Sequence, residues 1–117
     1  MRRITTLLAG LLVLVVVAPS TAATPRLTGT TGPGFTITVK RNGVKVKSLK
    51  AGKYTLVVAD KSNFHNFRIK GPGLNRAVTS VPFTGTKTVT VTLRAGRYTY
   101  QCDPHVPGMK GTFRVTR

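Results

Sequence analysis

The sequence has very few acidic residues. Its 117 residues include 2 Asp or Glu against 19 Lys or Arg, which gives a formal net charge of +17. The two carboxylates, Asp60 and Asp103, provide poorly for general acid–base catalysis, so the sequence does not favour an enzyme. A strongly basic surface repels copies of itself and attracts anions. We therefore expect a monomer whose partner is an acidic redox protein or an anionic cell-envelope surface. A generally basic exported proteome would also explain the charge.

The sequence also lacks an apolar run long enough to span a membrane. The longest one, residues 7–18, is shorter than the roughly 20 residues that a bilayer requires. It follows Arg2 and Arg3 and precedes small residues, a pattern typical of a secretory signal peptide. We predict a signal peptide over residues 1–23, cleaved after Ala22 or Ala23, although an uncleaved anchor is the alternative. The product would be secreted or periplasmic and would not span the membrane.

Cleavage would remove two basic residues and lower the net charge from +17 to +15. Nucleic acid is one possible anionic partner for such a chain. However, the basic residues are scattered through every predicted strand and form no arm or helical stripe, and an export signal argues against it. We expect no nucleic-acid binding.

Helical periodicity is missing from residues 24–117, where apolar residues alternate with polar ones instead. The alternation marks residues 35–39, 44–47, 54–58, 65–69, 89–93, 98–102 and 113–115. Asn42-Gly43 between two of these segments is a strong hairpin signal. The pattern predicts an all-β sandwich over residues 35–117, with Phe35 facing inward, preceded by a short linker or edge segment over residues 24–34. Residues 74–85 show no regular pattern.

Cysteine is almost absent, so no internal disulfide can form. A lone cysteine in an exported protein is paired between chains, reactive or bound to a metal. The single cysteine, Cys102, is followed by His105 and Met109, and the only other histidine is His65. Two histidines, one cysteine and a weak axial methionine are the ligand set of blue-copper centres.

The strand pattern favours a meeting of these side chains. His65, Cys102 and Met109 each fall in the inward phase of a predicted strand, at or near its end. Loops at one end of a sandwich cluster in space. Taken singly, each residue has an ordinary interpretation as part of the core. A structural zinc site would need four strong ligands, and methionine is not normally one. A Cys–His nucleophile would need an orienting group and an oxyanion hole that the sequence does not indicate.

At residues 64–67 (FHNF), 100–105 (YQCDPH) and 109–113 (MKGTF) the chain resembles the cupredoxins of the plastocyanin and amicyanin type. The resemblance covers residues 35–115. It implies a Greek-key β-sandwich and one type 1 copper ion per chain. It also implies that His65, Cys102 and His105 are the equatorial ligands and that Met109 is the axial ligand. Asn66 matches the asparagine that ties the first ligand region to the cysteine loop.

The resemblance implies a one-electron carrier that exchanges electrons at the solvent-side edge of His105, beside Val106 and Pro107. A module that stores, buffers or delivers copper would use the same ligands, so it remains the alternative. A third possibility is a basic adhesive domain on an anionic envelope with a vestigial metal site.

Overall fold

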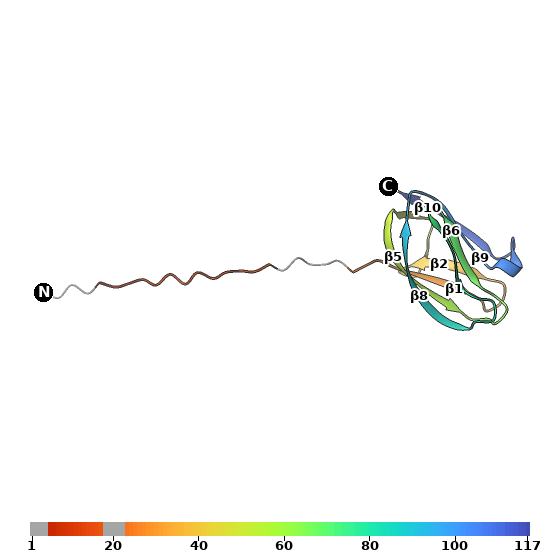
Figure 1. Ribbon diagram of the computed structural model, residues 1–117, viewed down its shortest axis with the longest axis horizontal. Helices are drawn as coiled ribbons and strands as arrows, with labels where there is room; N and C mark the ends of the chain where they lie inside the picture. The colour runs from red at the N-terminus through yellow and green to blue at the C-terminus, as the bar shows by residue number, and fades with distance from the viewer. Residues whose placement is uncertain (1–4, 18–22) are drawn as a thin grey trace.

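The computed structural model describes residues 5–17 and 23–117. Residues 5–17 contain neither helix nor strand and are exposed (Figure 1). The predicted signal peptide lies partly outside the described residues, and so does Ala22, one of the two predicted cleavage positions. In the part of the chain that is described, no helix is long and apolar enough to cross a membrane.

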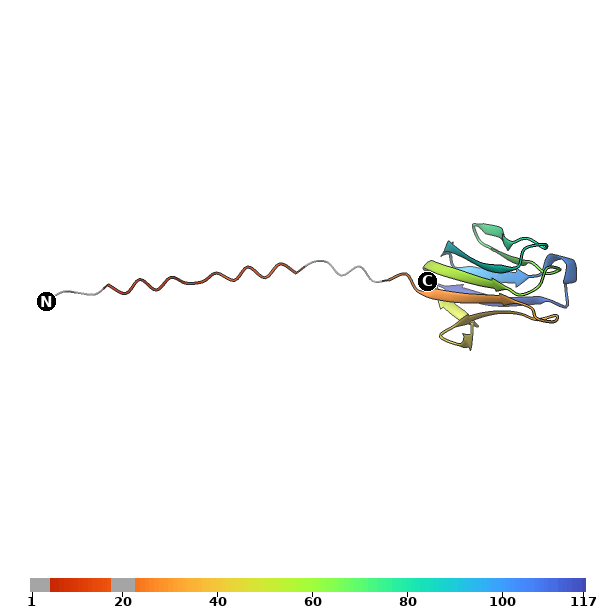
Figure 2. The ribbon, with the colours of Figure 1, turned by 90° about the horizontal axis from the view of Figure 1, so that it is seen from below.

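The domain is a sandwich of two five-stranded sheets with one short 3-10 helix, as the two views in Figures 1 and 2 show. The elements follow in the order β1 (Arg26–Thr31), β2 (Ile37–Arg41), β3 (Val44–Lys45), β4 (Ser48–Lys50), β5 (Gly52–Asp60), β6 (Phe67–Gly71), β7 (Leu74–Thr79), β8 (Gly85–Leu93), β9 (Gly96–Gln101), η1 (Asp103–His105) and β10 (Lys110–Thr116).

The first sheet has the order β3-β2-β1-β5-β8 and the second the order β4-β10-β9-β6-β7. The pairs β1–β5 and β4–β10 are parallel, and the other pairs are antiparallel. The chain crosses between the sheets after β3, β4, β5, β7 and β8. The predicted all-β sandwich is confirmed.

The core is formed by alternate residues of the strands, because successive side chains of a strand point to opposite faces of its sheet. In β5 the residues Tyr54, Leu56 and Val58 are buried, and in β9 Tyr98 and Tyr100 are buried. The aromatic rings of the second sheet stack in the core, for example Tyr98 on Phe113 and Phe67 on Tyr100.

The structure differs from the expected linker or edge segment at residues 24–34. Residues 26–31 form β1, which pairs with β2 on one side and with β5 on the other. The sequence did not predict this strand, because only one of its three buried residues, Leu27, Gly29 and Thr31, has a large apolar side chain. Gly29 is required by close packing, since a Cβ there would lie 2.9 Å from the ring of Phe67.

The predicted inward orientation of Phe35 is wrong. Gly32 and Gly34 adopt positive φ angles of 73° and 70°, so the chain turns here and β2 begins only at Ile37. Phe35 is 68% exposed as a result. The region without a predicted structure, residues 74–85, contains β7 and the first residue of β8.

Candidate metal centre

Two loops of the chain bring the predicted site residues to one end of the sandwich. His65 lies in the loop between β5 and β6, Cys102 follows β9, His105 ends η1, and Met109 directly precedes β10. The blue loop that carries the last three residues lies at the right-hand end of the sandwich in Figure 1. His65, Cys102 and Met109 are buried, and His105 is half-buried.

The two imidazoles and the thiol sulfur face one another. The Nδ1 atoms of His65 and His105 are 3.1 Å apart. The Sγ of Cys102 lies 3.7 Å from Nδ1 of His65 and 3.3 Å from Nδ1 of His105. Of the residues that the structure describes, these three form the one group of His, Cys, Asp or Glu arranged to hold a metal ion.

Hydrogen bonds orient the donor atoms. His65 donates Nε2–H to the carbonyl oxygen of Gly34 over 2.7 Å, which leaves the Nδ1 lone pair directed at the sulfur. The backbone N–H of Asn66 donates to Sγ of Cys102 over 3.5 Å and holds the sulfur in place. The histidine ring and the sulfur are therefore both held in position toward each other.

Asn66 and Asp103 join the two ligand loops. The Asn66 amide donates to the Asp103 carboxylate over 2.9 Å, and the Asp103 backbone N–H donates to Oδ1 of Asn66 over 2.7 Å. Gln101 and Arg68 also donate to this carboxylate. Burial raises the pKa of Asp103, but the hydrogen bonds from Gln101, Asn66 and Arg68 and the charge of Arg68 outweigh this effect, so its pKa lies below the ordinary value.

Backbone hydrogen bonds close the loop from Cys102 to Met109. His105 donates to the carbonyl oxygen of Cys102 over 3.1 Å, and Met109 donates to that of His105 over 2.9 Å. Cys102 in turn donates to the carbonyl oxygen of Met109 over 3.1 Å. The loop therefore holds Cys102 and His105 in fixed relative positions, and it places Met109 at its exit with a buried side chain.

Two exposed aromatic residues flank the imidazoles. Phe35 lies edge-on to His65 and His105, with ring centroids 5.6 Å and 5.1 Å away, and Phe64 lies 4.4 Å from the ring of His65. The strand pattern predicted an inward-facing Phe35 and indicated no role for Phe64. Phe64 precedes the inward-facing His65, and the period of two places it outward. That pattern could have identified it.

The residues present fit a copper ion. A point equidistant from the three donor atoms lies about 2 Å from each, within the range of metal–nitrogen bonds in proteins. The donors are two imidazoles and a thiolate, with the thioether of Met109 next in the chain to complete the set. Soft sulfur together with imidazole favours copper.

The fold and the donor set define the class as a small β-sandwich with a blue-copper type of site. The chain belongs to the copper-binding proteins of the plastocyanin/azurin family, whose model matches residues 37–116. The cupredoxin resemblance stated from the sequence is thereby confirmed. Copper is the cofactor of this family, and the cluster of His65, Cys102 and His105 with Met109 is its type 1 site in this chain.

Solved structures of rusticyanin share the fold. A structure described as the copper protein rusticyanin has a TM-score of 0.56 and 22% identity over 82% of this chain and 80% of that one. Reduced rusticyanin has a TM-score of 0.55 and 24% identity over 83% and 82%. Rusticyanin from Thiobacillus ferrooxidans has a TM-score of 0.50 and 23% identity over 82% and 79%. The comparison with curated proteins found no match.

Proposed function

We propose that this protein is an exported one-electron carrier. In this proposal His65, Cys102 and His105 are the equatorial copper ligands, Met109 is the axial ligand, and Asn66 supports the site from outside. The observation that carries the proposal is the triangle of two Nδ1 atoms and one sulfur at one end of the sandwich, with sides of 3.1, 3.3 and 3.7 Å.

Copper supplies a change of one electron between its two common oxidation states. The protein residues contribute a fixed frame, because electron transfer is fastest when ligands move little. Gly34 fixes the ring of His65, and the backbone N–H of Asn66 stabilises negative charge on the sulfur of Cys102. The closed loop limits the movement of His105 relative to Cys102.

The surroundings of the site support a carrier better than an enzyme. A hydrolytic or acid–base reaction would need a carboxylate that is free to exchange a proton. Asp103 is engaged by Asn66, Arg68 and Gln101, and Asp60 is buried. No other carboxylate side chain exists in the sequence.

The surface around His105 provides a place for a redox partner to dock. Val106 is 44% exposed, and Phe64 and Phe35 are 51% and 68% exposed. These three apolar side chains, with the half-buried ring of His105, form what we call the apolar rim. Lys61, four residues before His65, and Lys110, directly after Met109, are both exposed. Their positive charges would attract an acidic partner to this end of the sandwich.

Export and the domain limits belong to the same proposal. The signal peptide would occupy residues 1–23, and the exported domain would begin before β1, because β1 is paired on both sides within the first sheet. Intact-mass measurement of the exported protein would test this, with a mature chain starting at Ala23 or Thr24 as the expected result.

Electron self-exchange, measured from NMR line broadening in mixtures of oxidised and reduced protein, tests the carrier function. We expect rapid exchange in the unmodified protein and a rate about tenfold lower in Val106→Glu, because the added carboxylates would have to lose water where the apolar rims of two copies meet. Val44→Glu is the matched control, since Val44 is also exposed but lies in the β2–β3 hairpin. Slow exchange combined with ready loss of reduced copper to a chelator would instead indicate a copper carrier.

A further inference from the structure

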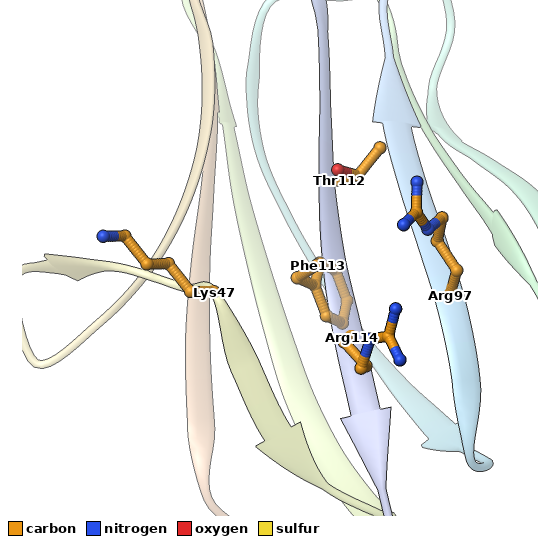
Figure 3. Close-up of a pocket in the computed structure, with 5 residues that line it drawn as sticks. All are labelled: Lys47, Arg97, Thr112, Phe113 and Arg114. Carbon is orange, nitrogen blue, oxygen red and sulfur yellow. The ribbon is translucent and has the colours of Figure 1, made fainter.

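A pocket on the outer face of the second sheet lies apart from the metal centre. It has a volume of about 220 Å³ and is lined by Lys47, Arg97, Thr112, Phe113 and Arg114. Figure 3 shows the guanidinium groups of Arg97 and Arg114 over the space between β9 and β10, while the amino group of Lys47 points away from them. The pocket is therefore lined mainly by positive charge.

Arg97 and Arg114 are directly opposite each other on neighbouring antiparallel strands. Like charges in this position repel each other and destabilise the pair of strands. Both side chains are exposed, and the repulsion is relieved when an anion binds between them. Two guanidinium groups offer several N–H donors in a geometry that suits the oxygens of a phosphate.

The protein itself offers no carboxylate side chain to this pair. Asp103 is bound by Arg68 on β6, and Asp60 is buried with its Oδ1 accepting the backbone N–H of Ser62. These are the two acidic residues of the sequence. Any carboxylate side chain that pairs with Arg97 and Arg114 must therefore belong to another molecule.

We propose that Arg97 and Arg114 form a binding site for a phosphate-type oxyanion, with Thr112 at its edge. The pocket is open and has room for one small oxyanion with part of its hydration shell. The ligand is a phosphate group, either free in solution or carried by an anionic phospholipid. Both sources present the same oxygens to the two guanidinium groups.

The position of the site gives it a use that is separate from electron transfer. Arg97 lies five residues before Cys102 along β9, a distance of about 17 Å in an extended strand. A phosphate-bearing surface bound to the outer face of this sheet would leave the end of the sandwich with His105 uncovered. The site would hold the protein at an anionic surface while its metal centre stays accessible.

The test is a titration with inorganic phosphate at constant ionic strength, with chloride as the reference anion. The signals followed are the side-chain Nε–Hε resonances of the arginines in NMR spectra. We expect saturable shifts for Arg97 and Arg114 with phosphate, and a dissociation constant at least about fivefold larger in Arg97→Gln, because one of the two charged donors is lost. Arg26→Gln, which removes an exposed guanidinium from the other sheet, should bind as the unmodified protein does.

Vesicles of phosphatidylglycerol identify the source of the phosphate, with phosphatidylcholine vesicles as the control. Weaker vesicle binding by Arg97→Gln than by Arg26→Gln would support a lipid headgroup, and phosphate binding without vesicle binding would support a soluble ligand. Equal phosphate affinities in all three proteins, or chloride acting as well as phosphate, would overturn the proposal. The visible spectrum of the copper-loaded protein is a separate measurement, so the result does not depend on the proposed electron transfer.

Discussion

At the scale of single residues, the metal centre depends on the hydrogen bonds that surround its donor atoms. The donor atoms are oriented by contacts to groups that are not ligands, namely the Gly34 carbonyl, the Asn66 backbone and the Asp103 carboxylate. The strand pattern predicted that His65 and Cys102 point inward, because each lies in phase with an apolar face. It could not predict the Arg68–Asp103 pair, because a salt bridge between residues 35 positions apart leaves no periodic signal in the sequence.

The link between the two ligand loops should contribute to stability. We expect Asn66→Ala to lower the free energy of unfolding by about 1–3 kcal/mol, because it removes two hydrogen bonds and leaves the partly buried N–H of Asp103 without its acceptor. Urea denaturation of the metal-free protein measures this effect. Asn63→Ala is the control, since Asn63 is exposed in the same loop. Equal losses in both variants would show that the link is not important.

At the scale of elements, the period of two predicted β2, β5, β6, β8, β9 and β10 well, because each has an apolar face and a polar face. Strand β1 escaped prediction because a glycine and a threonine occupy buried positions where an apolar side chain was expected. Phe35 was misplaced for a related reason. The alternation of apolar and polar residues places Phe35 in phase with β2, but the two glycines before it turn the chain. Positive φ angles of glycine end a strand in the structure while the alternation in the sequence continues.

Close packing of β1 against the second sheet can be tested at Gly29. A methyl group there would meet the ring of Phe67 at 2.9 Å and Val58 at 3.2 Å, so we expect Gly29→Ala to cost about 1–3 kcal/mol of stability. Thr28→Ala, at the neighbouring exposed position, should change the stability by about 0.5 kcal/mol or less. Thermal unfolding of both variants gives the comparison. Unchanged stability in Gly29→Ala would mean that β1 does not pack as described.

At the scale of the whole molecule, a small basic domain carries its metal centre at one end and its phosphate site on the face of one sheet. The composition predicted the attraction to anions but not its location, because the position of a charge on a surface depends on which strands become neighbours. Arg97 and Arg114 are separated by 17 residues in the sequence and lie side by side only through the pairing of β9 with β10.

Copper binding should stabilise the whole domain, because the ligands come from separate loops that unfolding would disperse. With free copper at about a thousand times its dissociation constant, we expect the free energy of unfolding to rise by about 4 kcal/mol. Chemical denaturation with and without copper measures the difference. Cys102→Ser should lose most of this gain. Equal stability of the loaded and metal-free proteins would show that the ion does not bind the folded site.

The absorption spectrum of the oxidised, copper-loaded protein tests the central claim most directly. A copper ion bound to the Cys102 thiolate and the two imidazoles should give an intense visible absorption band at about 600 nm. The band should disappear in Cys102→Ser while the far-ultraviolet circular dichroism of the β-sandwich is unchanged. A loaded protein without this band, or a Cys102→Ser variant that keeps it, would contradict the assignment of His65, Cys102 and His105 as a type 1 copper site.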